Sequence, residues 1–303
     1  MSAKGRPEGE LLPPGGKARS AKGAPVSAKG RPEGAPASPG ATAQAARAAP
    51  PLLAATGLVK AFGGFRAVDD VAFEVAERQL TGIVGTNGAG KSTAFALVAG
   101  QLAPDAGSVT LGGDDITRLS PSARARRGLA RTFQVPREFT HLTVRDNLLA
   151  AAPRTSGETL SSVFLQPRRV RAEEAAQAAI AERWLAFLNL AAVADLHAGK
   201  LSGGQKKLLE LGRVLMLAPR LILLDEPFAG VNPVLIGEIS ARIRELNATE
   251  GIAFVIIEHN LEALKRLVSQ LYVMDRGRVI AEGDPAAVLA DARVQEAYMG
   301  GVI

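Results

Sequence analysis

The chain has 303 residues, of which 47% are hydrophobic, and it contains no cysteine. A chain of this length and apolar content can bury a core in one or two domains. The lack of cysteine excludes disulfides, thiolate metal sites and a cysteine nucleophile. No window approaches the roughly 18 consecutive apolar residues of a membrane-spanning helix, and the N-terminus lacks the apolar core of a secretory signal, so we expect neither.

The net charge of +6 is concentrated in the first 50 residues, which hold eight Lys or Arg and three Glu. The rest of the chain therefore carries only +1, and no specific nucleic-acid partner is expected for it. Residues 1–51 are rich in Gly, Pro and Ala, and the octapeptide at 2–9 recurs at 27–34. We predict a disordered basic tail, because such a segment buries too little apolar surface to offset its ordering entropy. It is a solvated tail or the product of a misplaced start codon, or else a weak electrostatic tether to anionic lipid or RNA.

The first informative element is a predicted strand, loop and helix around residues 81–99. The loop at 85–93 reads Gly-Thr-Asn-Gly-Ala-Gly-Lys-Ser-Thr and fits the phosphate-binding pattern G-x-x-x-x-G-K-[ST]. Its glycines let backbone N–H groups approach an ATP tail, Lys91 suits the β- and γ-phosphates, and the Ser92 hydroxyl suits Mg²⁺. A chance match has a probability of roughly a few per cent in a chain this rich in glycine, and the apolar runs on both sides lower it further.

A helix is predicted within residues 171–190. Four apolar residues recur there at helical spacing and form one face: Ile180, Trp184, Phe187 and Leu188. We interpret Trp184 as a packing residue of this face.

Residues 201–205, Leu-Ser-Gly-Gly-Gln, are expected to begin a second helix that continues through residues 206–217. Ser202 suits the N-cap position of an ordinary helix entry. A glycine-rich helix start is also an anion site, so the structural and functional interpretations are compatible.

Residues 221–226, Leu-Ile-Leu-Leu-Asp-Glu, predict a strand that is buried on both faces and ends in two acids. Open α/β sheets bind ligands at the carboxyl ends of their strands. Asp225 suits the Mg²⁺ shell and Glu226 suits the general base of an ATPase. Taken alone, the pair could equally begin a surface loop.

A further apolar run, 253–257, precedes His259, and another lies at 271–274 before a turn at 276–278. We expect a functional role for His259, whereas His141 and His197 are expected to be structural. The return to alternating strands and helices after residue 201 predicts a doubly wound sheet.

The order and spacing of these motifs resemble those of the ATP-binding cassette (ABC) ATPases, from about residue 52 to the C-terminus. The resemblance implies an α/β fold of the P-loop ABC ATPase type, with a mainly parallel sheet core and an inserted helical subdomain at about 136–210. The domain organisation it implies is a tail at 1–51 and one ABC ATPase domain at 52–303.

The resemblance also implies a set of site residues. Gln134 matches the glutamine that senses the γ-phosphate and Mg²⁺ and faces the transmembrane partner. His259 matches the switch histidine, and Phe62 matches the aromatic that stacks on adenine, with Phe65 as a nearby competitor. The expected catalytic residues are Glu226, His259 and Gln134, and the expected metal ligands are Ser92, Gln134 and Asp225. The expected ATP-binding residues are Phe62, Gly85, Asn87, Gly88, Gly90, Lys91, Ser92, Thr93, Ser202, Gly203, Gly204 and Gln205.

Partners follow from the same resemblance. ATP is expected to lie between two cassettes, with Ser202 and Gly204 supplied by the second one, on permease subunits at the cytoplasmic face of the membrane. Four segments resemble the longer ATPase of branched-chain amino-acid importers: 131–134, 229–233, 257–260 and 296–300. That implies a heterodimer with a shorter sister, although a homodimer is possible.

Other functions remain open at this point. They are a urea or amide importer, a lipopolysaccharide exporter, and a soluble ABC ATPase outside transport. Two departures from the common family pattern are Thr86, where many members have proline, and Asn232, where many have aspartate.

Overall fold

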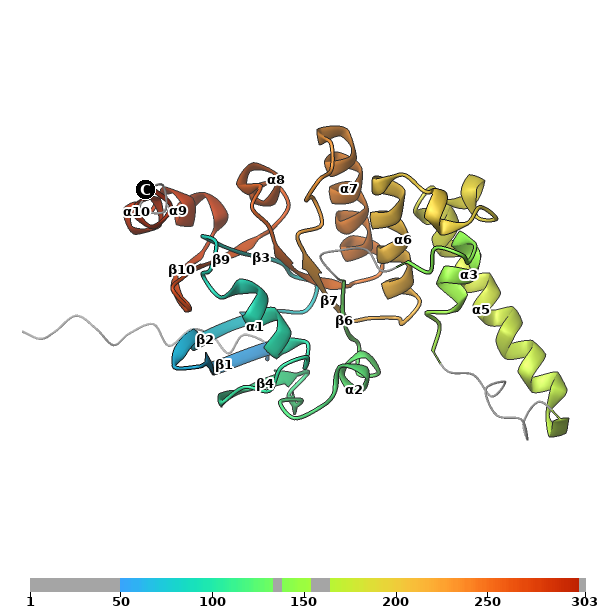
Figure 1. Ribbon diagram of the computed structural model, residues 1–303, viewed down its shortest axis with the longest axis horizontal. Helices are drawn as coiled ribbons and strands as arrows, with labels where there is room; N and C mark the ends of the chain where they lie inside the picture. The colour runs from blue at the N-terminus through green and yellow to red at the C-terminus, as the bar shows by residue number, and fades with distance from the viewer. Residues whose placement is uncertain (1–49, 133–137, 154–163, 300–303) are drawn as a thin grey trace, which may run out of the picture. The chain divides into compact units, whose positions relative to one another are not determined.

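The structure is a computed structural model and describes residues 50–132, 138–153 and 164–299. The predicted tail, apart from residues 50 and 51, lies outside these ranges and stays a prediction. Gln134 also lies outside them, and so does Gly300, the last residue of the segment at 296–300. The described part of the chain forms two β-sheets with helices around them (Figure 1).

The smaller sheet is antiparallel, with the strand order β2-β1-β4-β5. A tight turn at Gly63-Gly64, with φ of 53° and 90°, joins its two long strands and makes Phe62 and Phe65 cross-strand partners. Its strands are β1 (Leu53–Phe62), β2 (Phe65–Val75), β4 (Ala106–Leu111) and β5 (Asp114–Asp115).

The larger sheet has the order β10-β9-β3-β8-β7-β6 and is parallel except for its edge strand β10. Parallel neighbours in this sheet are joined by long crossover connections that contain helices, because two parallel strands cannot be joined by a short hairpin. This confirms the predicted mainly parallel core, including the strand ending at Asp225. Its strands are β3 (Leu80–Gly85), β6 (Leu129–Arg131), β7 (Leu221–Asp225), β8 (Ala253–Ile257), β9 (Gln270–Asp275) and β10 (Arg278–Gly283).

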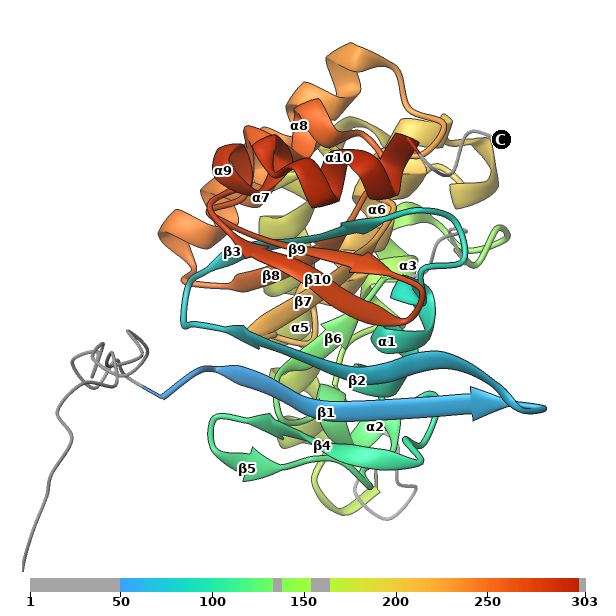
Figure 2. The same ribbon diagram turned by 90° about the vertical axis from the view of Figure 1, so that its left-hand side faces the viewer.

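The central strands are buried on both faces, and their alternate residues enter two different hydrophobic clusters. Leu221 and Leu223 of β7 pack with α1 (Lys91–Val98) and the antiparallel sheet, whereas Ile222 and Leu224 pack with the helices of the opposite face. Helix α1 consequently lies between the two sheets (Figures 1 and 2). This two-sided burial explains why β7 reads as an uninterrupted apolar run rather than an alternating one.

The other face of the parallel sheet is covered by α6 (Gly203–Leu215), α7 (Pro233–Thr249) and α8 (Leu261–Lys265). Near the C-terminus, α9 (Pro285–Ala290) and α10 (Ala292–Met299) lie beside β9 and β10 (Figure 2). None of the helices within the described ranges is long and apolar enough to cross a membrane.

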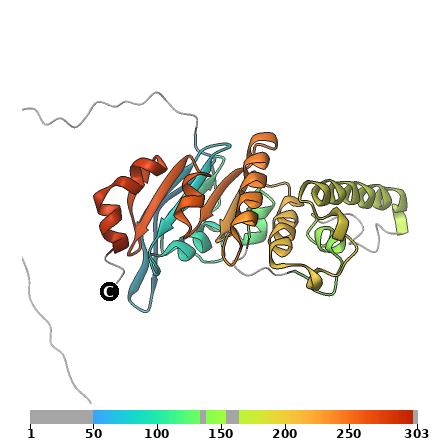
Figure 3. The same ribbon diagram turned by 90° about the horizontal axis from the view of Figure 1, so that it is seen from above.

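A group of helices occupies the stretch in which the helical subdomain is predicted (Figures 1 and 3). It comprises α3 (Val144–Leu149), α5 (Pro167–Phe187), the 3₁₀ turns η2 (Ala191–Val193) and η3 (Ala198–Lys200), and α6; the short α2 (Pro121–Ala125) precedes it beside β6.

The apolar face predicted for the long helix is partly wrong. Trp184 and Leu188 are buried as expected, but Ile180 is 39% exposed, and Ala181 and Leu185 complete the buried face instead. The face is therefore centred one position later than the largest apolar side chains suggest. The helix packs against α3 and α6, and the residues buried there belong to the same hydrophobic cluster as theirs.

Candidate functional site

The loop between β3 and α1 has a backbone that only glycine adopts without strain at its key positions. Gly85, Gly88 and Gly90 have φ of 155°, 80° and 95°. A Cβ on Gly90 would lie 2.2 Å from the carbonyl oxygen of Ala67, and one on Gly85 would lie 2.1 Å from that of Met274. The glycines therefore allow close backbone approach as well as the turn, which is what a phosphate-binding loop needs.

Lys91, the first residue of α1, folds its side chain back over this loop. Its Nζ donates to the carbonyl oxygens of Gly85, at 2.8 Å, and Thr86, at 2.9 Å. Burial lowers the pKa of Lys91, while the nearby carboxylates of Glu226 and Asp225 raise it. The ammonium is thus held at the loop by two neutral acceptors that an anionic ligand can replace.

The two predicted acids lie where the sheet order brings them, at the carboxyl end of β7. Asp225 is the last residue of the strand, and its side chain is only 4% exposed. Glu226 follows in a left-handed conformation, with φ of 51°, and its N–H donates to the carbonyl oxygen of Ile257 on β8. A non-glycine residue in this region costs about 1–2 kcal/mol, which is consistent with a functional position.

Glu226 and His259 are in contact, although 33 residues separate them in the sequence. The distance between His259 Nε2 and Glu226 Oε1 is 3.1 Å. Parallel pairing of β7 with β8 explains the contact, because both residues follow the carboxyl ends of adjacent strands. The sequence placed both residues in the site but did not predict that they touch.

Glu258 supports this arrangement and was missed by the sequence analysis. Its Oε1 accepts from the N–H of Phe228, at 2.6 Å, and its Oε2 accepts from those of His259 and Asn260. Burial raises the pKa of Glu258, and these three backbone hydrogen bonds oppose the rise. An acid directly after a buried strand and before the histidine was the available signal.

A cavity of about 300 Å³ lies between the phosphate loop and the pair of Glu226 and His259. Its lining combines the phosphate loop with the acid–histidine pair and one aromatic side chain: Phe65, Ala67, Asn87, Gly88, Ala89, Gly90, Lys91, Ser92, Thr93, Glu226 and His259. Phe62 is 48% exposed at the other side of the hairpin turn, near the Lys60 ammonium. The competitor aromatic, rather than Phe62, is thus the one that lines the cavity.

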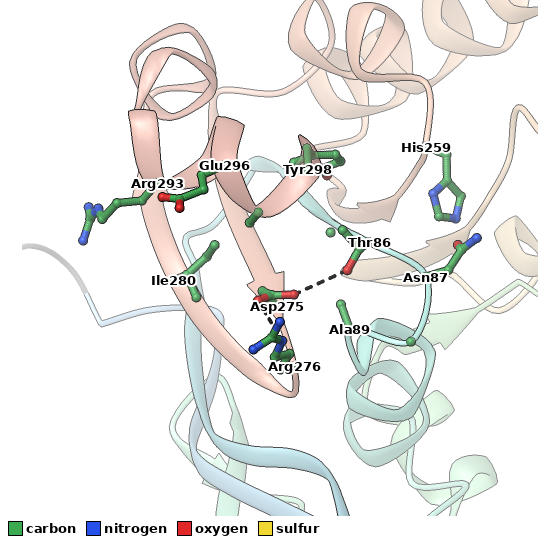
Figure 4. Close-up of a pocket in the computed structure, with 13 residues that line it drawn as sticks. Thr86, Asn87, Ala89, His259, Asp275, Arg276, Ile280, Arg293, Glu296 and Tyr298 are labelled. Atoms are coloured by element: carbon green, nitrogen blue, oxygen red, sulfur yellow. Dashed lines mark hydrogen bonds and ion pairs between the residues drawn. The ribbon is translucent and has the colours of Figure 1, made fainter. Parts of the chain in front are cut away.

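A second cavity, of about 960 Å³, shares His259 and part of the phosphate loop with the first (Figure 4). Its lining includes Asp275 at the end of β9, Arg276 of the following turn and Tyr298 of α10, and Thr86 Oγ1 donates to Asp275 Oδ1 at 3.4 Å. Burial raises the pKa of Tyr298 to about 12, against the effect of a hydrogen bond with the Gly85 backbone. The C-terminal helix therefore reaches the first glycine of the phosphate loop, a contact that no local pattern predicts.

The residues at 202–205 lie apart from both cavities, at the start of α6. Ser202 Oγ accepts from the N–H of Gln205, and the Gln205 side chain accepts from the N–H of Ser202, so the two form a capping box. A Cβ on Gly204 would meet Leu235 of α7, whereas Gly203 has open space around it. The structure thus divides the predicted ATP-binding residues into two separate groups.

The donors around Lys91 suit a magnesium ion bound together with phosphates better than a cage made of protein alone. Within the described ranges, no group of three or more His, Cys, Asp or Glu could hold a metal. Asp225 Oδ1, however, is buried without a hydrogen-bond partner among the described residues, and Ser92 supplies a hydroxyl at the cavity. Mg²⁺ commonly takes one or two protein oxygens and completes its shell with water and substrate phosphates.

The fold and this cavity define a phosphate-loop ATPase, and comparison with known proteins shows the family to which it belongs. The family model described as ABC transporter matches residues 68–229, and the model described as branched-chain amino acid ATP-binding cassette transporter matches residues 278–302. The chain belongs to the ABC transporter family, and it is an ATP-hydrolysing transporter subunit of that family.

Curated relatives cover most of the chain. A probable branched-chain amino acid transport ATP-binding protein LivG from Methanocaldococcus jannaschii is 40% identical over 82% of this chain and 97% of that protein. The high-affinity branched-chain amino acid transport ATP-binding protein BraF from Pseudomonas aeruginosa is 36% identical over 82% of this chain and 98% of that protein. The lipopolysaccharide export system ATP-binding protein LptB from Escherichia coli is 34% identical over 82% and 97%.

Solved structures agree with the fold. A nucleotide-free ATP-binding cassette from an ABC transporter has a TM-score of 0.72 at 40% identity, covering 82% of this chain and 98% of that one. The ADP conformation of an ATP-binding cassette has a TM-score of 0.71 at 39% identity, covering 83% of this chain and all of that one. ATPases of this family bind adenine nucleotides, dimerise and work with transmembrane permease subunits.

Proposed function

We propose that this chain energises an importer of branched-chain amino acids from the cytoplasmic face of the membrane. The observation that carries the proposal is the C-terminal match at residues 278–302, because the matching family model is described as a branched-chain amino acid ATP-binding cassette transporter. The names of the relatives LivG and BraF support the same solute class.

In the proposed mechanism, this chain holds the triphosphate of ATP in the smaller cavity. The amides of the glycine loop and the helix start of α1 face the phosphates, and phosphate oxygens replace the two carbonyls that now accept from Lys91. Phe65 or Phe62 stacks on the adenine. When bound, Mg²⁺ neutralises charge on the phosphates, held by Ser92 and Asp225 and, as the family pattern implies, by Gln134.

Glu226 is proposed as the general base that accepts a proton from the attacking water. His259 holds the Glu226 carboxylate at 3.1 Å and keeps it near the phosphate loop. Glu226 follows the end of β7 with a left-handed backbone, and it lines the smaller cavity beside the phosphate loop. Positioning and charge stabilisation, rather than covalent chemistry, supply the catalysis in such a site.

A second cassette is proposed to complete the site. The start of α6 lies away from this chain's own cavity, so its residues are available to the nucleotide of a partner cassette. These residues are Ser202, Gly203, Gly204 and Gln205. The N–H groups at the helix start and the partial positive charge there would face the γ-phosphate. We propose a heterodimer with a shorter sister subunit, docked on two permeases.

Glu226→Gln tests both the base and the dimer. It keeps the shape of the side chain but removes its basicity, so we expect hydrolysis to fall by a factor on the order of 10²–10⁴. ATP should then trap a closed dimer, measured by size-exclusion chromatography with and without nucleotide, using the sister subunit where one is found. Lys91→Ala is the matched control, which should neither bind ATP nor dimerise. A Glu226→Gln chain that hydrolyses ATP at the unmodified rate would contradict the base assignment.

The partner proposal is tested by purifying Glu226→Gln with ATP from detergent-solubilised membranes. Recovery of permeases and a shorter cassette, with uptake of leucine, isoleucine or valine by the reconstituted complex, would support the importer. The alternative is a lipopolysaccharide exporter, which the 34% identity to LptB favours. Permeases that transport lipopolysaccharide would establish that alternative, and recovery of soluble proteins alone would overturn transport.

A further inference from the structure

Arg131 forms a buried ion pair with the Asp225 carboxylate. Arg131 Nη2 lies 2.7 Å from Asp225 Oδ2, with side-chain exposures of 13% and 4%. The two residues are 94 positions apart in sequence, and Arg131 begins the segment 131–134 that resembles the importer ATPases, without a site role in that resemblance. A buried ion pair must offset the loss of hydration of both charges, so it requires good geometry and further contacts from the residues around it.

Strand pairing explains how the two side chains meet. In the parallel pair of β6 and β7, Arg131 lies opposite Leu223, and Asp225 is two residues further along β7. Residues two apart in a strand share a face, so Asp225 projects on the same side as Leu223. That side packs against α1, which carries the phosphate loop.

The guanidinium is itself held from α1 and the residues after it. Its carbon lies 5.7 Å from the centre of the buried Phe95 ring, in cation–π contact, and Nη1 donates to the Gln101 side chain at 2.6 Å. Arg131 thus has one nitrogen on Gln101, one on Asp225, and its plane near Phe95. A lysine could supply the charge but not both directed contacts.

The consequence lies in the two oxygens of Asp225. Oδ2 accepts from Arg131, whereas Oδ1 is buried without a hydrogen-bond partner among the described residues. Resting on the magnesium role proposed for Asp225, we propose that Arg131 is a positioning residue for the metal. It fixes the carboxylate by Oδ2 and offsets its charge while no cation is bound, and this leaves Oδ1 for the hydrated Mg²⁺.

The test measures magnesium dependence rather than turnover alone. Binding of a fluorescent ATP analogue is titrated in EDTA and then against Mg²⁺ for the wild type, Arg131→Lys and Arg131→Gln. Partners that orient metal ligands typically change metal affinity about 10–100-fold when replaced. For both variants we expect the Mg²⁺ concentration that gives half of the maximal change in analogue binding to rise about 10–100-fold. In EDTA, their affinity for the analogue should stay within about twofold of the wild-type affinity.

Arg220→Gln is the matched control, because Arg220 forms a 2.6 Å ion pair with Glu77 in which both side chains are about half exposed. It should leave the Mg²⁺ dependence unchanged. Folded Arg131 variants with the wild-type Mg²⁺ dependence would overturn the proposal. Failure of the wild type to bind the analogue would instead overturn the proposed function, so the two failures are distinguishable.

Stability without nucleotide gives a second readout should Arg131→Gln fold poorly. Urea unfolding is compared for Arg131→Gln, Asp225→Asn and the double variant. The double variant should recover much of the loss caused by Arg131→Gln, because it leaves no buried charge unpaired. Additive effects of the two substitutions would contradict the ion pair on which the proposal depends.

Discussion

At the scale of single residues, the glycines of the phosphate loop are not equivalent. Gly88 and Gly90 both have positive φ, but only Gly90 is enclosed, by the carbonyl oxygen of Ala67. Gly88→Ala should therefore cost about 1–2 kcal/mol through backbone strain alone. Gly90→Ala adds a clash with rigid backbone and should cost clearly more, with loss of ATP binding. Urea unfolding and nucleotide titration of the two variants test this, and equal costs would contradict the role of the close approach.

Glu258 predicts a pH dependence of stability. Burial raises its pKa in the folded chain, so the folded state holds the proton at higher pH than the unfolded state does. Protonated Glu258 therefore contributes to the free energy of unfolding. This contribution is fully present below the ordinary glutamate pKa of about 4.3, and it is lost as the pH rises through the pKa of the folded state. Glu258→Gln, which cannot ionise, should reduce this loss between mildly acidic and neutral pH.

Urea unfolding of Glu258→Gln across that pH range provides the measurement. Glu262→Gln is the control, because Glu262 lies on the adjacent helix α8 with its side chain 79% exposed. A pH profile of Glu258→Gln that matches both the wild type and this control would contradict the prediction.

At the scale of elements, Ser202, which precedes α6, has one role that the structure shows and one that is proposed. Ser202 caps the helix, and the same hydroxyl is proposed to face the partner's nucleotide. Ser202→Ala should cost about 1 kcal/mol of stability through loss of the cap. It should also weaken ATP-dependent dimerisation, which the loss of a cap alone does not explain.

Thr143→Ala separates these two effects. Thr143 caps α3 in the same manner, accepting from the N–H of Asp146 at 3.0 Å. The variant should show a similar loss in thermal unfolding while its ATP-dependent dimerisation stays normal, measured with Glu226→Gln in the background. Equal loss of dimerisation in both cap variants would assign the effect of Ser202 to helix stability.

At the scale of the whole molecule, the site joins both sheets, so nucleotide binding should stabilise the whole described fold. The cavity is lined by β2 of one sheet, α1 between the sheets, and residues after β7 and β8 of the other. ATP with Mg²⁺ at 100 times its Kd should add about 2.7 kcal/mol to the unfolding free energy. For a domain of this size that is a rise of roughly 5–10 °C in Tm.

Scanning calorimetry of the wild type, Glu226→Gln and Lys91→Ala measures this effect. The first two should show the rise, and Lys91→Ala should not. An equal rise in Lys91→Ala would mean that the nucleotide binds elsewhere on the chain.

Local patterns were sufficient for the parts of the molecule whose physics is local. The phosphate loop, the strand ending at Asp225 and the cap at Ser202 each show in contiguous residues, as glycines with positive φ, an uninterrupted apolar run or a capping hydrogen bond. These are decided within a few residues, so a sequence determines them by itself. The family motifs then indicated which ligand such a loop and such acids bind. The predictions for Gln134 and the tail stay untested, since both lie outside the described residues.

Only the tertiary structure decided which distant residues meet. The contact of Glu226 with His259, the pair of Arg131 with Asp225, and the reach of Tyr298 to the phosphate loop depend on strand order and register. The buried face of α5 and the aromatic that lines the cavity were decided in the same way. Such contacts arise when separately formed elements pack. The register between β6 and β7, rather than any spacing along the chain, brings an arginine to the carboxylate proposed to bind magnesium.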